Sequence, residues 1–262
     1  MLSPIREIAK QAGEVIMEYY QPDGMDEVIA KGDGSPVTIA DREAEALITP
    51  LLRQLTPDVP VIGEEASDGG SLPDISGGQF WLVDPLDGTK DFIKGLGEFT
   101  VNIALVLDGR PVMGVIYAPA IDEEYGACGV GTAFERRGNG ADTPIEVVTP
   151  DLGKLRILGS RNHGNPEALE KFMNGREVGS FVARSSSLKF CEVAAGRADI
   201  YPRFGNTCEW DTAAGQAILE GAGGVVTSTD GGLFPYAKAD RKFLNDGFIA
   251  WGGVGPAEWL GG

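Results

Sequence analysis

The sequence predicts a mixed α/β protein whose two α/β halves share one cleft. Segments with helical periodicity alternate with short apolar segments, and 38 Gly and 16 Pro supply turns between them. A length of 262 residues suits one large domain or two tightly apposed halves, and no internal repeat or long linker interrupts the chain. Because the rhythm changes near residue 149, we expect one half at 1–148 and the other at 149–262.

Two amphipathic helices open the N-terminal half. Apolar residues recur at helical spacing over residues 5–20 and again over residues 37–55. Residues 60–65 predict a short strand that ends in carboxylates, and residues 79–89 predict a buried strand that runs into a tight turn. Residues 100–119 alternate around an Asp-Gly-Arg-Pro turn, which is typical of a hairpin.

Strands and helices alternate in the C-terminal half. The predicted strands cover residues 155–160, 198–204 and 223–228. The predicted helices cover residues 166–174, 187–196 and 211–223, and the last two end at glycines, which favour helix C-termini. The tail after Phe248 shows no interpretable pattern.

The net charge of −17 limits the kinds of partner. Lys and Arg number 22 against 39 Asp and Glu, which argues against broad contact with a nucleic acid polymer or polybasic contact with an anionic membrane. The N-terminus lacks the apolar core of a signal peptide, and no apolar run approaches the roughly 18 residues of a membrane span. Three separated cysteines without a CxxC pair favour neither a zinc knuckle nor a disulfide framework, and indicate a reducing cytoplasm.

Two common catalytic motifs are missing from the sequence. The single histidine, His163, lies in a Gly/Asn-rich loop and no serine lies in a GxSxG elbow, which argues against a Ser-His-Asp hydrolase. The string nearest to a P-loop, residues 129–134, lacks the third glycine and predicts an ordinary turn.

Residues 81–89 are the most informative segment. An apolar strand leads to Asp84, Pro85 fixes the backbone, Asp87 follows three residues later, and Gly88 allows a close backbone approach. Both carboxylates and the Leu86 carbonyl can converge in such a turn, and hard oxygen ligands of this kind suit Mg²⁺. If residues 88–90 open a helix, their N–H groups would also face an anion. The alternative is a plain type I turn with an Asx cap.

Further carboxylates accompany this segment. Glu64 and Glu65 end the preceding predicted strand about twenty residues earlier, and Asp211 lies at or near the start of a predicted helix. By themselves they could be a solvated strand end and an ordinary helix N-cap. Together with Asp84 and Asp87, in a chain with one histidine, they favour a two-metal phosphoryl-transfer site.

Three strings carry a family resemblance. GEE at 63–65, DPLDGTKDF at 84–92 and WDTAA at 210–214 resemble the inositol monophosphatase superfamily of Mg²⁺-dependent, lithium-sensitive phosphatases. SSSLKFCEVAAG at 185–196 and YPRFG at 201–205 resemble its CysQ-type branch of 3'(2'),5'-bisphosphate nucleotidases, which remove the 3'-phosphate of adenosine 3',5'-bisphosphate. The likeness runs from the first helix to about Phe248. It implies a layered αβαβα sandwich of the sugar-phosphatase type.

The resemblance implies a role for each matching residue. One Mg²⁺ would be held by Glu64, Asp84 and the Leu86 carbonyl, and a second by Asp84, Asp87 and Asp211. Thr89 and Asp41 would orient and deprotonate the attacking water. Asp41 also suits a helix N-cap and Thr89 a cap hydroxyl, and these alternatives stay open.

The resemblance also implies a nucleotide site. Ser186, Lys189 and Arg203 would hold the 5'-phosphate, and His163 would line the adenosine, beside the substrate contacts of Glu64, Leu86, Asp87, Gly88, Thr89 and Asp211. A solvated lysine and a loop histidine without a role are the alternatives for Lys189 and His163.

These expectations describe a Mg²⁺-dependent phosphomonoesterase that converts adenosine 3',5'-bisphosphate to AMP and phosphate. The alternatives are an inositol or sugar monophosphatase, and a catalytically silent protein that senses nucleotide or Mg²⁺. The expected partner is a small bisphosphate. A homodimer and a peripheral position at the inner membrane stay open beside the cytoplasmic location.

Overall fold

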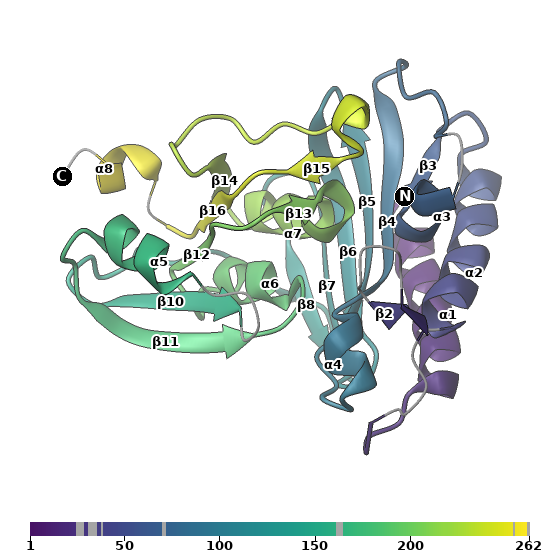
Figure 1. Cartoon of the computed structure of the whole chain (residues 1–262), viewed down its shortest axis with the longest axis horizontal. Helices are drawn as coiled ribbons and strands as arrows, with labels where there is room; N and C mark the ends of the chain where they lie inside the picture. Colours follow the sequence, from purple (N-terminus) through teal and green to yellow (C-terminus); the bar gives the residue numbers. More distant parts are fainter. Residues whose placement is uncertain are drawn as a thin grey trace.

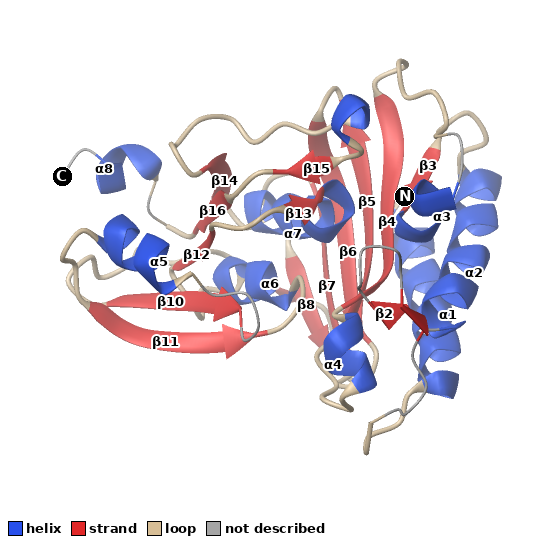
Figure 2. Ribbon diagram, in the orientation of Figure 1, coloured by secondary structure: helices blue, strands red, loops and turns tan. Residues whose placement is uncertain are grey.

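The chain folds into five alternating layers of helix and sheet (Figure 1). Our computed structural model describes residues 1–24, 29–30, 36–37, 39–69, 72–160, 165–253 and 255–260. The layers are the helix pair α1 (Leu2–Tyr19) and α2 (Ile39–Leu55), a seven-stranded sheet, the pair α6 (Leu188–Ala194) and α7 (Glu209–Gly221), a five-stranded sheet, and the pair α5 (Pro166–Met173) and α8 (Pro256–Leu260). Figure 2 shows the alternation by colour, and the predicted layered sandwich is confirmed.

The first sheet runs in chain order from β3 to β9. Its strands are β3 (Val61–Gly63), β4 (Gln79–Asp87), β5 (Thr100–Leu107), β6 (Arg110–Ala118), β7 (Glu123–Cys128), β8 (Phe134–Arg137) and β9 (Thr143–Pro144). β3 pairs parallel with β4, and the other neighbours are antiparallel. Asp108 and Gly109 both have a positive φ between β5 and β6, as a tight hairpin turn requires, so the predicted hairpin is confirmed.

The second sheet has the order β11-β10-β12-β16-β14. Its strands are β10 (Leu155–Ser160), β11 (Val178–Arg184), β12 (Ile200–Arg203), β14 (Val225–Ser228) and β16 (Phe248–Trp251). The remaining elements are short: the pair β1 (Ile29–Ala30) and β2 (Pro36–Val37), the pair β13 (Thr207–Cys208) and β15 (Leu244–Asn245), the helices α3 (Glu64–Gly69) and α4 (Thr89–Ile93), and a 3₁₀ turn at Ala239–Arg241.

One apolar core joins the two sheets through α6 and α7. Phe80 of the first sheet, Phe190 of α6 and Phe248 of the second sheet belong to the same buried cluster. Gly114 lets α7 lie against β6, because a Cβ there would be 2.5 Å from the Ala214 carbonyl oxygen. The expected boundary at 148/149 falls between β9 and β10, and it stays a prediction because both halves share this core.

The outer helices complete two further cores. α1 and α2 pack on the other face of the first sheet through residues such as Ile8, Ile48 and Trp81. On the far side, Trp251 and Trp259 bury their rings with α5. The tail that showed no pattern is therefore part of the packed structure.

Most predicted elements are confirmed within a few residues, with three corrections. Glu64 and Glu65 begin α3, whereas the sequence predicted that they end a strand. Asp41 is the third residue of α2, so the N-cap alternative was wrong. The strands that were not predicted are β1, β2, β7, β8, β9, β11, β13, β15 and β16, and helix α8 was not predicted either. β11 has a largely exposed face without the alternation that reveals a strand.

Within the described ranges, no helix is long and apolar enough to cross a bilayer. The three cysteines, Cys128, Cys191 and Cys208, are all free thiols.

Candidate active site

A pocket of about 480 Å³ lies where the β4–α4 turn, the loop before α6, the end of β12 and the start of α7 meet. Ten of the residues predicted to act line it: Glu64, Asp84, Leu86, Asp87, Gly88, Thr89, Ser186, Lys189, Arg203 and Asp211. They come from both halves of the chain. The structure thus brings the predicted carboxylates and the predicted cations together in the lining of one pocket.

The end of β4 shapes one wall. Asp84 is 1% exposed, and its Oδ1 accepts a hydrogen bond from the Leu86 N–H at 3.0 Å. The Leu86 carbonyl accepts one from the Thr89 hydroxyl at 3.1 Å. Gly88 turns the chain with a φ of 94°, a conformation that glycine adopts at little cost. The turn therefore presents two aspartates, a carbonyl and a hydroxyl within six residues.

Hydrogen bonds from Ser187 orient Asp87, and a backbone hydrogen bond from Cys208 orients Asp211. The N–H and the hydroxyl of Ser187 both lie 2.7 Å from Asp87 Oδ2. Asp211, in the first turn of α7, accepts from the Cys208 N–H at 2.8 Å through Oδ2. Asp84, Asp87 and Asp211 each keep a second carboxylate oxygen to which no described residue hydrogen-bonds. None of the three forms an ion pair with a described Lys or Arg.

Burial and mutual repulsion act on these carboxylates. Burial raises the pKa of Asp84 well above its usual value, and the charges of Glu64, Asp87, Asp211 and Asp41 raise it further. Burial likewise raises the pKa of Asp211, with added repulsion from Asp87 and Glu64. The neutral donors around this cluster do not cancel its negative charge, so a bound cation would stabilise it.

The donor set fits Mg²⁺ chemically. Carboxylate oxygens and a backbone carbonyl are the hard ligands that this ion takes, and the hydrogen bonds to one oxygen of each aspartate fix the other for a ligand. In the part of the chain that the structure describes, no three His, Cys, Asp or Glu side chains converge on one point at ligand spacing. The predicted ligands thus share the pocket, while their closure around an ion remains a prediction.

Two cations also line the pocket. Lys189 is 5% exposed, and its ammonium donates to the carbonyls of Ser186 at 2.7 Å and Arg184 at 3.3 Å. Burial lowers the pKa of Lys189 to about 8, although the charge of Asp87 opposes this shift. Arg203 donates weakly to the carbonyls of Gly205 and Asn206 at 3.4 and 3.3 Å. Among the described residues both cations therefore donate hydrogen bonds only to neutral carbonyls, and they can attract an anion.

Ser186 lines the pocket, and its hydroxyl already has protein partners. Its φ is 57°, and its hydroxyl lies 2.8 Å from Thr100 Oγ1 and donates to the Asp87 carbonyl at 3.0 Å. The side chain is thus already engaged by protein, and its backbone turns the carbonyl toward Lys189. A phosphate contact by Ser186 stays a prediction.

Of the predicted residues that the structure describes, one is not at the pocket wall. Asp41 is buried in the first turn of α2 and is close enough to affect the pKa of Asp84, but it is not among the described residues that line the cavity. His163 lies outside the described residues. A second, apolar pocket of about 130 Å³ adjoins the first at Tyr201 and Arg203.

Sequence reasoning missed the residues that support the site. Asn102 donates to Ser187 Oγ at 2.8 Å, and Glu98 accepts from the Ser185 N–H at 3.1 Å. A polar residue inside the apolar run at 100–107 was the available signal for Asn102. Nothing local marks Glu98, because its partners lie more than 80 residues away.

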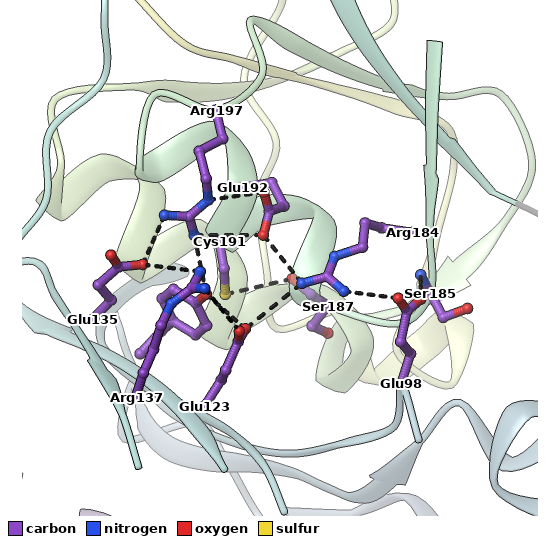
Figure 3. A network of polar contacts seen from close by, with 11 residues as sticks. Glu98, Glu123, Glu135, Arg137, Arg184, Ser185, Ser187, Cys191, Glu192 and Arg197 are labelled. Atoms are coloured by element: carbon purple, nitrogen blue, oxygen red, sulfur yellow. Dashed lines mark hydrogen bonds and ion pairs between the residues drawn. The ribbon is translucent and has the colours of Figure 1, made fainter. Parts of the chain in front are cut away.

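A network of ion pairs, here called the seam network, contacts the loop before α6. It comprises Glu98, Glu123, Glu135, Arg137, Arg184, Glu192 and Arg197 (Figure 3). Arg184 bonds Glu98 at 2.7 Å and Glu192 at 3.2 Å, and Arg197 bonds Glu135 at 2.7 Å and Glu192 at 2.9 Å. The network links the first sheet to α6 and β11.

The chain is similar to known phosphatases over nearly its whole length. Residues 1–252 match the model of the inositol monophosphatase family. The 3'(2'),5'-bisphosphate nucleotidase CysQ of Escherichia coli K12 is 42% identical over 248 residues, covering 95% of this chain and 98% of that protein. The crystal structure of CysQ from Bacteroides thetaiotaomicron, 36% identical, superposes with a TM-score of 0.78 over 97% of both chains. An inositol monophosphatase from Anabaena, 29% identical, gives a TM-score of 0.74 over 97% of this chain and 91% of that one.

Proposed function

The chain belongs to the inositol monophosphatase family, and from this we propose that it is a Mg²⁺-dependent 3'(2'),5'-bisphosphate nucleotidase. Its reaction would remove the 3'-phosphate of adenosine 3',5'-bisphosphate by water attack, giving AMP and phosphate. The observation that carries the proposal is the pocket itself, whose wall has oriented aspartates on one part and two cations on another. A substrate with two phosphates can occupy both.

The carboxylate wall would perform the hydrolysis. Glu64, Asp84, the Leu86 carbonyl, Asp87 and Asp211 would hold Mg²⁺, which would supply positive charge against the phosphoryl oxygens. Thr89 and Asp41 would orient the attacking water and take its proton. The water oxygen forms a bond to phosphorus, the bond from phosphorus to the 3'-oxygen breaks, and that oxygen gains a proton. The Thr89 hydroxyl supports this role, because its bond to the Leu86 carbonyl fixes it on the same turn.

The cationic wall would hold the phosphate that does not react. Lys189 and Arg203 line the pocket and donate hydrogen bonds only to neutral carbonyls among the described residues, so each has charge to offer an anion. The adjoining apolar pocket, lined by Phe181, Tyr201 and Phe204, supports a position for the base. A monophosphate would leave the cations without a partner, which argues for the bisphosphate.

A substrate panel tests the proposal. Phosphate release from adenosine 3',5'-bisphosphate, inositol 1-phosphate and a sugar phosphate is measured with Mg²⁺ and with EDTA. We expect Mg²⁺-dependent release and the highest kcat/KM with the bisphosphate. Preference for the inositol ester would assign the chain to the monophosphatase alternative, and no turnover of any ester would favour the silent sensor.

An Arg203→Gln variant separates the two walls. We expect it to raise KM for the bisphosphate by about tenfold, because one charged hydrogen bond to phosphate is lost, and to leave inositol 1-phosphate turnover unchanged. Equal effects on both substrates would reject the anion-binding role. The cytoplasmic location remains a proposal that cell fractionation would check. The homodimer that the sequence leaves open would be checked by sedimentation.

A further inference from the structure

A group of neutral polar side chains, buried except for the partly exposed Ser186, lies against the predicted metal ligands. Thr100 and Asn102 come from β5, and Ser186 and Ser187 come from the loop that precedes α6. Asn102 and Ser187 are each 1% exposed. Asn102 shares its strand face with Ala104, which packs in the central apolar core. A polar side chain there costs free energy unless it is hydrogen-bonded, so the group needs a reason to be present.

The hydrogen bonds of this group end on the predicted metal ligands. Asn102 Nδ2 donates to Ser187 Oγ at 2.8 Å, and Thr100 Oγ1 lies 2.9 Å from Asn102 Oδ1, which fixes the amide orientation. Ser187 Oγ in turn lies 2.7 Å from Asp87 Oδ2 and 2.9 Å from the Asp211 carbonyl. One hydroxyl therefore contacts β4, β5 and α7 at the point where the site is assembled.

Ordinary helix capping does not account for Ser187. It is the N-cap residue of α6, where serine is favoured because its oxygen can accept a hydrogen bond from the helix N–H groups. In this structure the side chain makes no such capping bond. The hydroxyl faces Asp87 and Asn102 instead.

We propose that Asn102 and Ser187 are positioning residues that fix the Asp87 carboxylate for Mg²⁺. Three donors reach Oδ2: the N–H and the hydroxyl of Ser187 at 2.7 Å and the Asn102 amide at 3.4 Å. They hold the carboxylate plane and leave Oδ1 for a ligand, and because all three are neutral the carboxylate keeps its full charge for the cation. Asn102 acts mainly through Ser187, whose hydroxyl it contacts at 2.8 Å, and adds a long direct bond to Asp87. The inference rests on the proposed function, since it takes Asp87 as a metal ligand.

Titration of the metal-free full chain with MgCl₂ by calorimetry tests this without any turnover. We expect Ser187→Ala to raise the dissociation constant for Mg²⁺ about 10- to 100-fold, the range known for lost hydrogen-bond partners of metal ligands. Ser187→Thr keeps the hydroxyl and is expected to restore binding. Asn102→Ala is expected to weaken Mg²⁺ binding less than Ser187→Ala. In the Ser187→Ala background its effect should be smaller than in the wild type, because only its 3.4 Å bond to Asp87 is then lost.

Thr227→Val is the matched control. Thr227 is also buried, and its hydroxyl accepts from the Trp251 indole N–H at 2.9 Å in the second sheet. It should lower the thermal midpoint without changing Mg²⁺ affinity. Equal Mg²⁺ affinity in Ser187→Ala and the wild type would overturn the inference, and if Ser187→Ala does not fold, unchanged affinity in Asn102→Ala does so. Absence of Mg²⁺ binding by the wild type would instead overturn the proposed metal site.

Discussion

Two clusters of charge lie on either side of the loop before α6, and they are built on opposite principles. In the seam network every glutamate has an arginine partner, as Figure 3 shows for Arg184 and Arg197. In the pocket, Asp84, Asp87 and Asp211 accept bonds from neutral donors, and no described Lys or Arg pairs with them. In the seam network each glutamate is paired with an arginine of the protein, whereas in the pocket the aspartates keep negative charge for a ligand.

This difference assigns the acidity of the chain to separate roles. A paired carboxylate contributes to stability, and removing its partner leaves an uncompensated charge. A carboxylate held by neutral donors among like charges opposes folding, which the raised pKa values of Asp84 and Asp211 express. The net charge of −17 is thus no single signal of function. Charge removal should therefore have opposite effects on stability in the two clusters.

The largest expected effect is that of Asp84→Asn on turnover. Asparagine can still accept from the Leu86 N–H, so the turn is kept while the charge is lost. Several kcal/mol of transition-state stabilisation should disappear, which lowers kcat about 10²-fold or more. In the absence of Mg²⁺ the thermal midpoint should not fall, because repulsion is relieved. Steady-state kinetics and thermal melts measure both.

Asp151→Asn is the control for this variant. Asp151 makes the same type of turn bond, to the Gly153 N–H at 2.9 Å, on the surface and outside the pocket. Its kcat should equal that of the wild type. Wild-type kcat in Asp84→Asn, or a similar loss in both variants, would contradict a metal-binding role for Asp84.

The next effect concerns stabilisation by Mg²⁺. An ion that binds only the folded chain adds about 2.7 kcal/mol at a concentration of 100 times its dissociation constant, which raises the thermal midpoint by roughly 5–10 °C. EDTA should reverse the increase. Asp84→Asn should lose most of it, whereas a variant of the seam network should keep it. An equal increase in all variants would place the ion elsewhere.

Arg197→Met tests the seam network and should have a smaller effect. Arg197 is one-third exposed and bonds Glu135, Glu192 and the Tyr125 hydroxyl. Solvent screens part of the interaction, so we expect unfolding free energy to fall by about 2 kcal/mol in urea melts. Mg²⁺ affinity and kcat of the folded enzyme should change little.

Arg241→Met is the exposed counterpart. Arg241 pairs with Asp246 at the surface, both well exposed, and its loss should leave the unfolding free energy almost unchanged. If both arginine variants lose the same free energy, the seam network contributes no more than a surface ion pair.

The sequence located the carboxylates because they stand at recognisable places in predictable elements. Asp84 ends an apolar strand and precedes a proline and a glycine, and Asp211 opens an amphipathic helix. Local chemistry was enough in both cases. The same holds for the β5–β6 hairpin, whose turn residues accept a positive φ.

Long-range partners could not be read in this way. The bond from Asn102 to Ser187 joins residues 85 apart, and the bond from Ser187 to Asp87 joins residues 100 apart. Neither the strand order of the sheets nor the pairing of charges in the seam network follows from local periodicity. The N-cap alternative for Asp41 was wrong because an N-cap and a buried residue of the first turn share the same sequence signal.

The last prediction uses Lys189, the one buried cation of the pocket with a shifted pKa among the described residues. Burial holds its pKa near 8, so the ammonium is charged below that pH and loses its proton as the pH rises above it. If the charged form binds the second phosphate, KM for the bisphosphate should be flat up to about pH 8. It should then rise about tenfold by pH 10, within the limit of one decade per pH unit. kcat/KM profiles for the bisphosphate and for inositol 1-phosphate, recorded from pH 6.5 to 10, measure this.

The Lys189→Met variant makes the assignment specific. It should have a raised KM for the bisphosphate that no longer responds to pH in this range, while the monophosphate profile matches that of the wild type. A fixed KM in the wild type would mean that Lys189 is structural, and that its bonds to the Ser186 and Arg184 carbonyls are its whole role. The stability sign differs from that of binding: because the folded pKa lies below the unfolded value, burying Lys189 costs most below pH 8, and folding stability gains as the pH rises from about 8 toward 10.5. Weaker substrate binding together with higher stability over one pH interval is therefore the signature of a cation buried for its ligand, and a seam-network arginine, always charged, cannot produce it.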